Sequence, residues 1–173
     1  MKWVVIGVAV LAFLIGTLFL VGLLLPREHR ATCRARFRIA PQALFDRLTD
    51  VEGYPRWRSD VRSARRIALP DGRPGFVEET GEGPRTYAVE ASEPPGRLVT
   101  RVADDDLPYG GTWTFTLVPD GSGTALAITE DGFVGPALFR TLARFVFGHH
   151  ATMESYLEAL ARGLGESVTV ERG

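Results

Sequence analysis

The sequence GTWTFTLVPDGSGTALAITE, residues 111–130, decides the fold of this chain. Apolar and polar residues alternate on both sides of a turn that contains Pro119, Asp120 and Gly121. Strict alternation is typical of half-buried β-strands, and a connection of a few residues joins antiparallel neighbours. Residues 111–118 and 123–130 are therefore predicted to form two paired strands.

The same pattern extends outward from this hairpin toward the amino terminus. Four further segments alternate and end in turn residues; they span residues 62–69, 75–80, 85–91 and 97–103. A fifth, residues 31–39, places three arginines on one face of a predicted strand. The short connections indicate an antiparallel sheet. The residues predicted to point inward are Tyr87, Val89, Leu98, Thr100, Val102, Trp113, Phe115, Leu117, Leu126, Ile128 and Glu130.

Helical spacing of apolar residues appears near both ends of this strand series. Residues 41–50 are predicted to form a helix that begins at Pro41, followed by a short helical or turn segment. Residues 136–163 are predicted to form a long helix, which Gly148 would kink. A sheet with one apolar face must be covered, and this last helix is long enough to cover it. The predicted class is α+β, with a curved antiparallel seven-stranded sheet gripping the long C-terminal helix.

Residues 3–25, WVVIGVAVLAFLIGTLFLVGLLL, contain no charged residue. A helix of this length spans roughly 34 Å, enough to cross a hydrocarbon core of about 30 Å. A cleaved signal peptide is the alternative, but the apolar stretch is long for one, and LPREHR, residues 25–30, offers no small-residue cleavage site. The sequence predicts a single-pass membrane anchor, joined to the first strand by a linker of about five residues.

Charge and cysteine content limit the function classes. The net charge is −1 with both signs spread along the chain, so nucleic-acid binding is not expected. The single cysteine, Cys33, excludes an intramolecular disulfide and a cysteine-based zinc cluster. We expect no metal and no cofactor. The arginines that follow the apolar helix favour a cytoplasmic domain. The expected divisions are an anchor at residues 1–29, a folded domain at 30–165 and a flexible tail at 166–173.

Two ordered stretches resemble a known superfamily. The first joins IAPQALF, residues 39–45, to DVEGYPRW, residues 50–57; the second runs from TWTF, residues 112–115, through TEDG, residues 129–132, to the last helix. Their order resembles the SRPBCC (START-like) superfamily and its polyketide cyclase/dehydrase branch. The resemblance implies a helix-grip fold with a pocket for an apolar ligand between sheet and last helix. It does not imply catalysis, because the superfamily includes many binders and carriers.

The implied pocket draws its residues from the short helical segment, the sheet and the last helix. The predicted ligand-binding residues are Tyr54, Trp57, Phe76, Tyr87, Val89, Leu98, Thr100, Tyr109, Trp113, Phe115, Ile128, Phe139, Leu142, Phe145, Val146, His149 and Met153. Tyr54 and Trp57 either form part of a lid or pack the short helices onto the sheet. Tyr87, Thr100 and Tyr109 either supply polar contacts in an apolar cavity or are core residues.

Three titratable residues are candidate acids or bases. His149 lies in the apolar stripe of the last helix and titrates near neutral pH; a structural, hydrogen-bonded histidine is the alternative. In the strand alternation, the side chains of Glu78 and Glu130 fall on the inward face of the sheet. If both enter the pocket, they would share a proton or position a polar ligand group. The alternative is a pair of solvated carboxylates at strand ends.

The last helix and the residues before it carry more aromatic side chains than one covered face requires. Phe133, Phe139, Phe145 and Phe147 indicate a partner surface, a membrane-facing surface or a ligand entrance. The alternative is that some of them are core residues and a few are simply exposed.

Three functional hypotheses follow. The first is a membrane-anchored protein that binds a hydrophobic small molecule, such as a lipid, a quinone or a polyketide-like compound, with the bilayer and this ligand as its partners. The second is a cyclase or dehydratase-like enzyme. The third is a membrane-associated interaction module with a collapsed cavity. The sequence identifies no protein partner.

Overall fold

The structure, a computed structural model, describes residues 1–104 and 106–173, with the side chain of Phe147 outside the described part. The helical elements are α1 (Lys2–Leu24), α2 (Pro41–Thr49), the 3₁₀ turn η1 (Val51–Arg56), α3 (Ala137–Leu142), the π-helical turn η2 (Ala143–Phe147) and α4 (Ala151–Gly163). The strands are β1 (Glu28–Phe37), β2 (Val61–Ala68), β3 (Pro74–Thr80), β4 (Gly83–Glu93), β5 (Arg97–Val102), β6 (Tyr109–Asp120), β7 (Gly123–Val134) and β8 (Glu171–Arg172).

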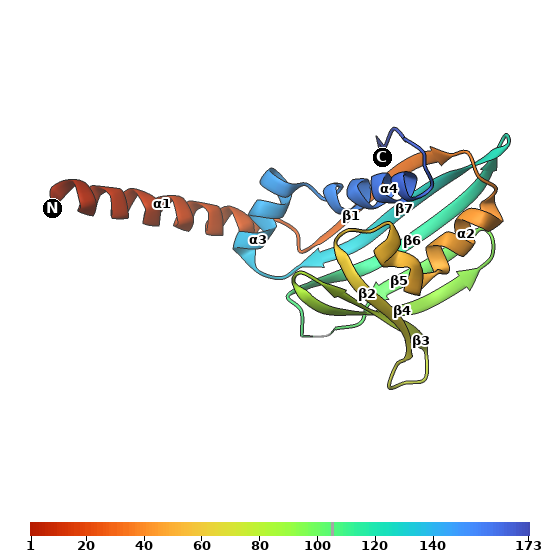
Figure 1. The fold of residues 1–173 in the computed structure, drawn as a ribbon. Helices are drawn as coiled ribbons and strands as arrows, with labels where there is room; N and C mark the ends of the chain where they lie inside the picture. The colour runs from red at the N-terminus through yellow and green to blue at the C-terminus, as the bar shows by residue number, and fades with distance from the viewer. Residues whose placement is uncertain (105) are drawn as a thin grey trace.

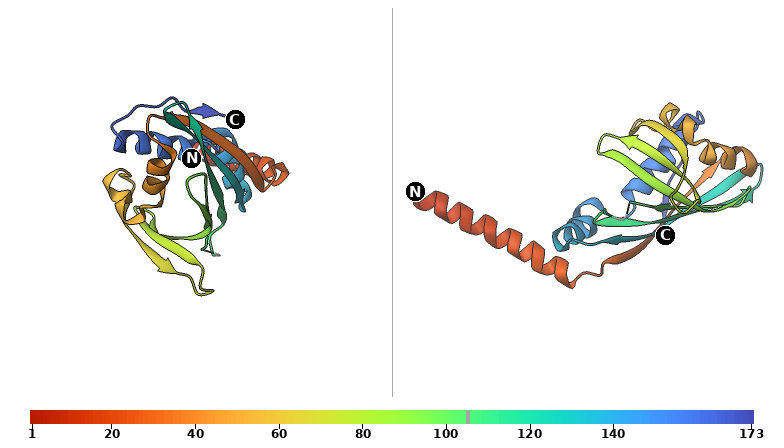
Figure 2. Two further views of the ribbon diagram at one scale, coloured as in Figure 1. Left: turned by 90° about the vertical axis from the view of Figure 1, so that its right-hand side faces the viewer. Right: turned by 90° about the horizontal axis from the view of Figure 1, so that it is seen from below.

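The strands of the described chain form one antiparallel sheet in the order β2-β3-β4-β5-β6-β7-β1-β8. Strands β2 to β7 follow one another as a meander, and β1 pairs with β7. Phe115 of β6 lies opposite Ile128 of β7, as the predicted hairpin requires. Figures 1 and 2 show the sheet curving around α4, with α1 projecting from the domain as a separate rod. The predicted α+β class is confirmed.

The core fills the space between the concave face of the sheet and helices α2 and α4. Alternation along the strands predicted most of its sheet side, since Leu98, Phe115, Leu117, Leu126 and Ile128 are buried; Val102 and Trp113 are half-buried. The largest buried contributors include Leu98, Phe115, Leu117, Leu126 and Ile128 from the sheet, Leu44 and Leu48 from α2, and Met153, Leu157 and Leu160 from α4.

The predicted number of strands was wrong. The sheet has eight strands in the described residues, because the segment expected to be a flexible tail contributes β8. Cys33 and Arg34 of β1 pair with Arg172 and Glu171, and Arg172 also donates to the Glu154 carboxylate of α4. A strand of two residues is too short for alternation to reveal it.

The prediction of one long helix over residues 136–163 was also wrong, although Gly148 was correctly identified as its weak point. Gly148 has a φ of +73°, a conformation that favours glycine, and its N–H donates to the Ala143 carbonyl at 2.9 Å. This five-residue spacing is that of a π-turn. Within residues 136–163, α4 packs on the sheet, while α3 lies beside the end of α1 (Figure 1).

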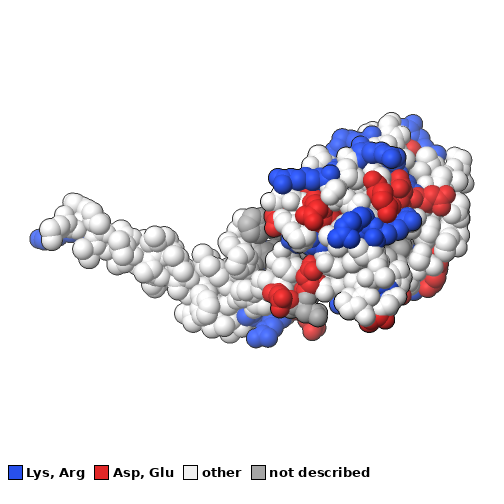
Figure 3. Space-filling view, turned by 60° about the horizontal axis from the view of Figure 1, so that its bottom comes forward, with Lys and Arg blue, Asp and Glu red and all other residues white. Residues whose placement is uncertain are grey.

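Helix α1 is long and apolar enough to cross a membrane. Apart from Lys2 at its first position, α1 carries no charged residue, and Figure 3 shows the charged side chains gathered on the folded domain. The link to the domain is shorter than predicted, because β1 already begins at Glu28 and leaves only Leu25, Pro26 and Arg27 between the two elements.

Candidate ligand pocket

A cavity of about 610 Å³ lies between the concave face of the sheet and α4. Its volume falls within the range of roughly 300–1,000 Å³ that is usual for small-molecule sites. The sheet lines most of it, and α4 contributes the face that carries Tyr156 and Ala159. Six lining residues are exposed and mark the mouth: Asp60, Tyr109, Phe133, Ala151, Thr152 and Ser155.

Nine of the predicted site residues line this cavity. They are Tyr54, Phe76, Glu78, Tyr87, Thr100, Tyr109, Trp113, Phe115 and Glu130. The pairing of neighbouring strands explains why: Thr100 of β5 lies opposite Trp113 of β6, so their side chains share one face of the sheet. Contact of these residues with a ligand stays a prediction.

The other predicted residues lie outside the lining. Leu98, Ile128 and Met153 are buried in the core, and Val89 is half-buried beside a bulge in β4. Phe139, Leu142, Phe145 and Val146 lie on α3 and η2, which the Gly148 break carries away from the sheet. The structure therefore places these four residues outside the cavity lining.

The two aromatic residues of the short helical segment divide between the roles considered for them. Tyr54 lines the cavity and donates a hydrogen bond from its hydroxyl to the Leu48 carbonyl at 2.6 Å. Trp57 packs edge-on against Tyr54 and Tyr156, with ring centroids 5.5 and 5.3 Å away. Trp57 thus has the packing role rather than a place on the cavity wall.

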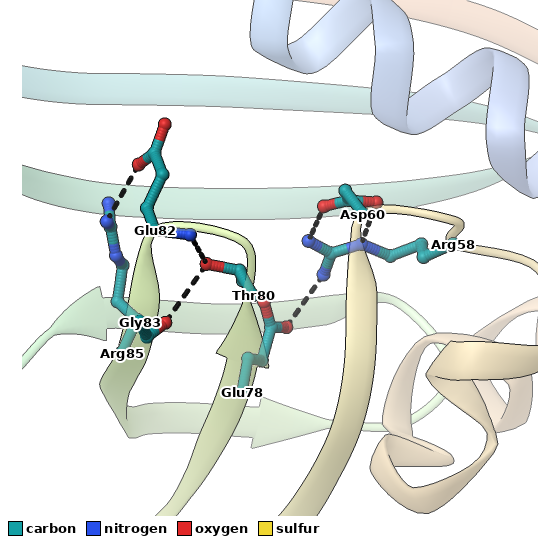
Figure 4. A network of polar contacts seen from close by, with 7 residues as sticks. All are labelled: Arg58, Asp60, Glu78, Thr80, Glu82, Gly83 and Arg85. Atoms are coloured by element: carbon teal, nitrogen blue, oxygen red, sulfur yellow. Dashed lines mark hydrogen bonds and ion pairs between the residues drawn. The ribbon is translucent and has the colours of Figure 1, made fainter.

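A buried ion pair forms one polar wall of the cavity. Arg58 Nη1 donates to Glu78 Oε1 at 2.7 Å, and Nη2 donates to Asp60 Oδ2 at 2.7 Å (Figure 4). The guanidinium also lies 5.5 and 5.4 Å from the ring centroids of Tyr54 and Tyr156. Two carboxylates and two aromatic rings therefore hold the Arg58 head group in place.

Burial shapes the electrostatics of this wall. It raises the pKa of Glu78, although the positive charge of Arg58 opposes the shift. Burial alone would lower the pKa of Arg58, but the hydrogen bond to Asp60 and the charge of Glu78 outweigh it and raise that pKa. Burial also raises the pKa of Tyr87 and of Tyr156, so both phenols keep their protons. Glu78 Oε2 is buried without a hydrogen-bond partner among the described residues.

A second titratable cluster includes His149. The Nε2 atom of His29 lies 3.9 Å from Glu130 Oε2, and both residues line the cavity. His149 stacks on His29 with ring centroids 3.9 Å apart and is not in the lining. Burial lowers the pKa of His149, and the neighbouring His29 adds to this shift. His149 thus packs against His29 instead of facing the cavity, and an acid–base role for it stays a prediction. In the part of the chain that the structure describes, no group of three or more His, Cys, Asp or Glu residues is arranged to hold a metal ion.

Several lining residues had no functional signal in the sequence. Arg58 and Asp60 lie in a turn without periodicity, and Tyr156 has the helical spacing of a core residue. The sequence analysis also assigned no role to Arg85 or His29, which both line the cavity. The one available signal was the alternation that placed Glu78 inward, because a carboxylate on an apolar face requires a cationic partner.

A curved antiparallel sheet closed by a C-terminal helix, with a cavity between them, defines a START-like helix-grip protein. Residues 28–166 match the family described as polyketide cyclase / dehydrase and lipid transport, and the chain belongs to this family. The predicted superfamily and fold are thereby confirmed, and the family supports a role in binding hydrophobic ligands.

Solved structures share this fold at low sequence identity. A START superfamily protein from Mycobacterium smegmatis is 20% identical with a TM-score of 0.56, over 78% of this chain and 94% of that one. A protein from Mesorhizobium loti is 22% identical with a TM-score of 0.59, over 79% and 97%. One from Rhodobacter sphaeroides is 24% identical with a TM-score of 0.55, over 81% and 99%. A comparison with curated proteins found no match.

Proposed function

We propose that this chain is a membrane-anchored protein that binds a hydrophobic small molecule, such as a lipid, a quinone or a polyketide-like compound, in the cavity under α4. The observation that carries the proposal is the cavity of about 610 Å³ in a member of a family described by polyketide chemistry and lipid transport. A cavity of this size favours this proposal over the interaction-module hypothesis, which expected a collapsed interior.

The lining favours an amphiphilic ligand. Phe76, Trp113 and Phe115 provide apolar walls for a ring system or a chain. Glu78 Oε2 is a buried acceptor without a partner among the described residues, and Tyr87 keeps its phenolic proton. A ligand with an apolar body and one hydroxyl or amine group would satisfy the Glu78 oxygen, which is costly to leave unpaired.

The apolar helix supports the membrane part of the proposal. An apolar ligand partitions into a bilayer, and the short connection of Leu25 to Arg27 would keep the cavity beside that reservoir. The domain is expected on the cytoplasmic side, because basic residues follow the helix.

Native mass spectrometry of the full chain tests this function. The protein is purified in lipid nanodiscs and released from them in the gas phase of the mass spectrometer. Bound apolar compounds are identified by the mass of the complex and, separately, by solvent extraction of the purified protein. Val102→Trp fills the cavity from its half-buried lining position. Val118→Trp is the matched control, because Val118 is exposed near the far end of β6.

We expect wild type and Val118→Trp to retain the same compound and Val102→Trp to lose it, with all three equally folded by circular dichroism. An empty wild-type protein would contradict the proposal. Equal retention by Val102→Trp would assign the bound compound to α1 rather than to the cavity.

A second candidate function is chemistry on the bound ligand. It is favoured by Glu78, whose raised pKa suits proton transfer inside the cavity. The compound that co-purifies with Glu78→Gln is incubated with wild type and with the variant. Conversion, for example by loss of water, with wild type only would establish an enzyme, whereas an unchanged compound in both samples would leave a binding protein.

A further inference from the structure

We propose, on the basis of the membrane anchoring proposed above, that α3 and η2 form a second membrane-contacting segment. In this arrangement Phe139, Phe145 and Val146 enter the hydrocarbon edge of the bilayer beside α1. The occupant of this exposed apolar surface is the lipid leaflet, and the mouth of the cavity lies at the membrane surface.

The first support is the tight packing of α3 on the end of α1. A Cβ atom at Gly22 would overlap the carbonyl of Ala137, so the two helices approach at backbone distance. Thr141 donates its hydroxyl proton to the Leu18 carbonyl at 2.7 Å. Arg140 Nη1 donates to the Leu25 carbonyl at 2.8 Å. These contacts fix α3 at the level of the last two turns of α1.

The second support is the depth that these contacts impose. Leu18 lies six residues before Leu24, which is about 9 Å along the helix. The 23 residues of α1 span roughly 34 Å and exceed a hydrocarbon core of about 30 Å by only about 4 Å. Even if all of this surplus lies at the domain end, Leu18 remains about 5 Å inside the hydrocarbon. Its hydrogen-bond partner Thr141 must then lie near that depth.

The third support is the chemistry of the surface that α3 and η2 expose. Phe139, Phe145 and Val146 are 58%, 67% and 66% exposed. Aromatic and aliphatic side chains are typical of segments that lie in the membrane interface. Arg144 in η2 and Arg27, three residues after the end of α1, are exposed and are suited to anionic head groups. This surface also adjoins α1, because α3 and α1 are packed together.

The cavity mouth lies next to this segment. Phe133 and Tyr109 line the cavity and are exposed. Phe133 is three residues before Pro136, the residue that precedes α3. Gly135 donates its N–H to the Pro108 carbonyl at 2.8 Å, which ties both sides of the mouth to the start of α3. An apolar ligand would therefore enter from lipid with little exposure to water.

Spin-label accessibility in vesicles tests the inference. Full-length protein is reconstituted in phosphatidylcholine vesicles containing phosphatidylglycerol and is labelled at Phe145→Cys, Val146→Cys or Phe139→Cys. Wild type, whose only cysteine is buried, gives the background. Val118→Cys is the aqueous control, since Val118 is 52% exposed on the folded domain, and Phe13→Cys reports on α1 itself. Collisions with oxygen report lipid, and collisions with a water-soluble nickel chelate report water.

We expect labels at 139, 145 and 146 to favour oxygen several-fold over the label at 118, as the label at 13 does. If the label at 13 is in lipid but the labels at 139, 145 and 146 are as accessible to the nickel chelate as the label at 118, the inference is overturned and the anchor stands. A label at 13 in water would remove the anchor and the inference together. Dipolar broadening between labels at 145 on neighbouring chains would assign this surface to a dimer and also overturn the inference.

Discussion

Replacing Arg58 with methionine removes the cation of the buried pair and leaves Glu78 in place. Methionine keeps much of the length of the arginine stem, so the change acts mainly on charge. Removing one partner of a buried ion pair costs about 3–5 kcal/mol, because the remaining charge is left without compensation. Asp60 does not replace the lost cation, since it is itself a carboxylate.

The size of this loss depends on pH, because Glu78 can take up a proton. Burial already raises the pKa of Glu78 in the wild type, and Arg58→Met removes the charge that opposes this shift. Between the unfolded pKa, about 4.3, and the higher folded pKa, the native state binds more protons than the unfolded state. The free energy of unfolding of the variant therefore falls as pH rises through this window, by up to about 1.4 kcal/mol per pH unit. The deficit relative to wild type should therefore be smaller at pH 5 than at pH 8.

Guanidinium denaturation of the full chain in nanodiscs, followed by the fluorescence of Trp57 and Trp113, measures this difference at both pH values. Arg97→Met is the matched control, because Arg97 pairs with Glu93 at the surface. The free energy of unfolding of this control should fall by roughly 0–1 kcal/mol at either pH. A loss in Arg58→Met that is as small as in the control, or that is the same at pH 5 and pH 8, would refute a desolvated Arg58–Glu78 pair.

Two further predictions concern α1 and the histidine cluster. Gly22→Val should separate α3 from α1 and speed amide hydrogen exchange in residues 137–142. Gly16→Val is the control, because a Cβ atom at Gly16 meets no atom within 4 Å, and it should leave this exchange unchanged. Equal exchange rates in the two variants would contradict the packing of α3 on α1. The folded pKa of His149 lies below its unfolded value, so its contribution to stability is lost as pH falls below about 6.5. His149→Gln should therefore show a smaller drop in denaturation midpoint between pH 7.5 and 5.5 than wild type, and an unchanged drop would argue against this linkage.

The sequence predicted the sheet well because alternation is a local signal. Trp113, Phe115 and Leu117 repeat every second residue, and their burial or place in the lining follows from strand geometry alone. The same rule placed Glu78 on the inner face. It gave no partner for this carboxylate, because Arg58 lies in a turn twenty positions earlier and meets Glu78 only through the tertiary fold.

The structure of the region after β7 could not be predicted from local sequence patterns. Gly148 marked a break in the helical pattern, but the direction of α3 depends on its packing against Gly22 and Leu18, more than a hundred residues earlier. No periodicity within residues 136–147 contains that information. The cavity lining therefore includes most of the site residues predicted on the sheet and none of those predicted on the segment before the break, and their contact with a ligand stays a prediction.

Strand β8 bears on how neighbouring copies of this chain meet. An unpaired edge strand offers its N–H and C=O groups to another chain. β8 occupies part of the outer edge of β1, and Gly173 extends it by donating its N–H to the Thr32 carbonyl at 2.9 Å. The opposite edge, β2, carries the exposed Arg62, Arg65 and Arg66. If α1 anchors copies of the chain in one bilayer, as proposed, their sheets would lie at equal height, an arrangement that favours edge-to-edge aggregation. A two-residue strand at one edge and a row of arginines at the other oppose it.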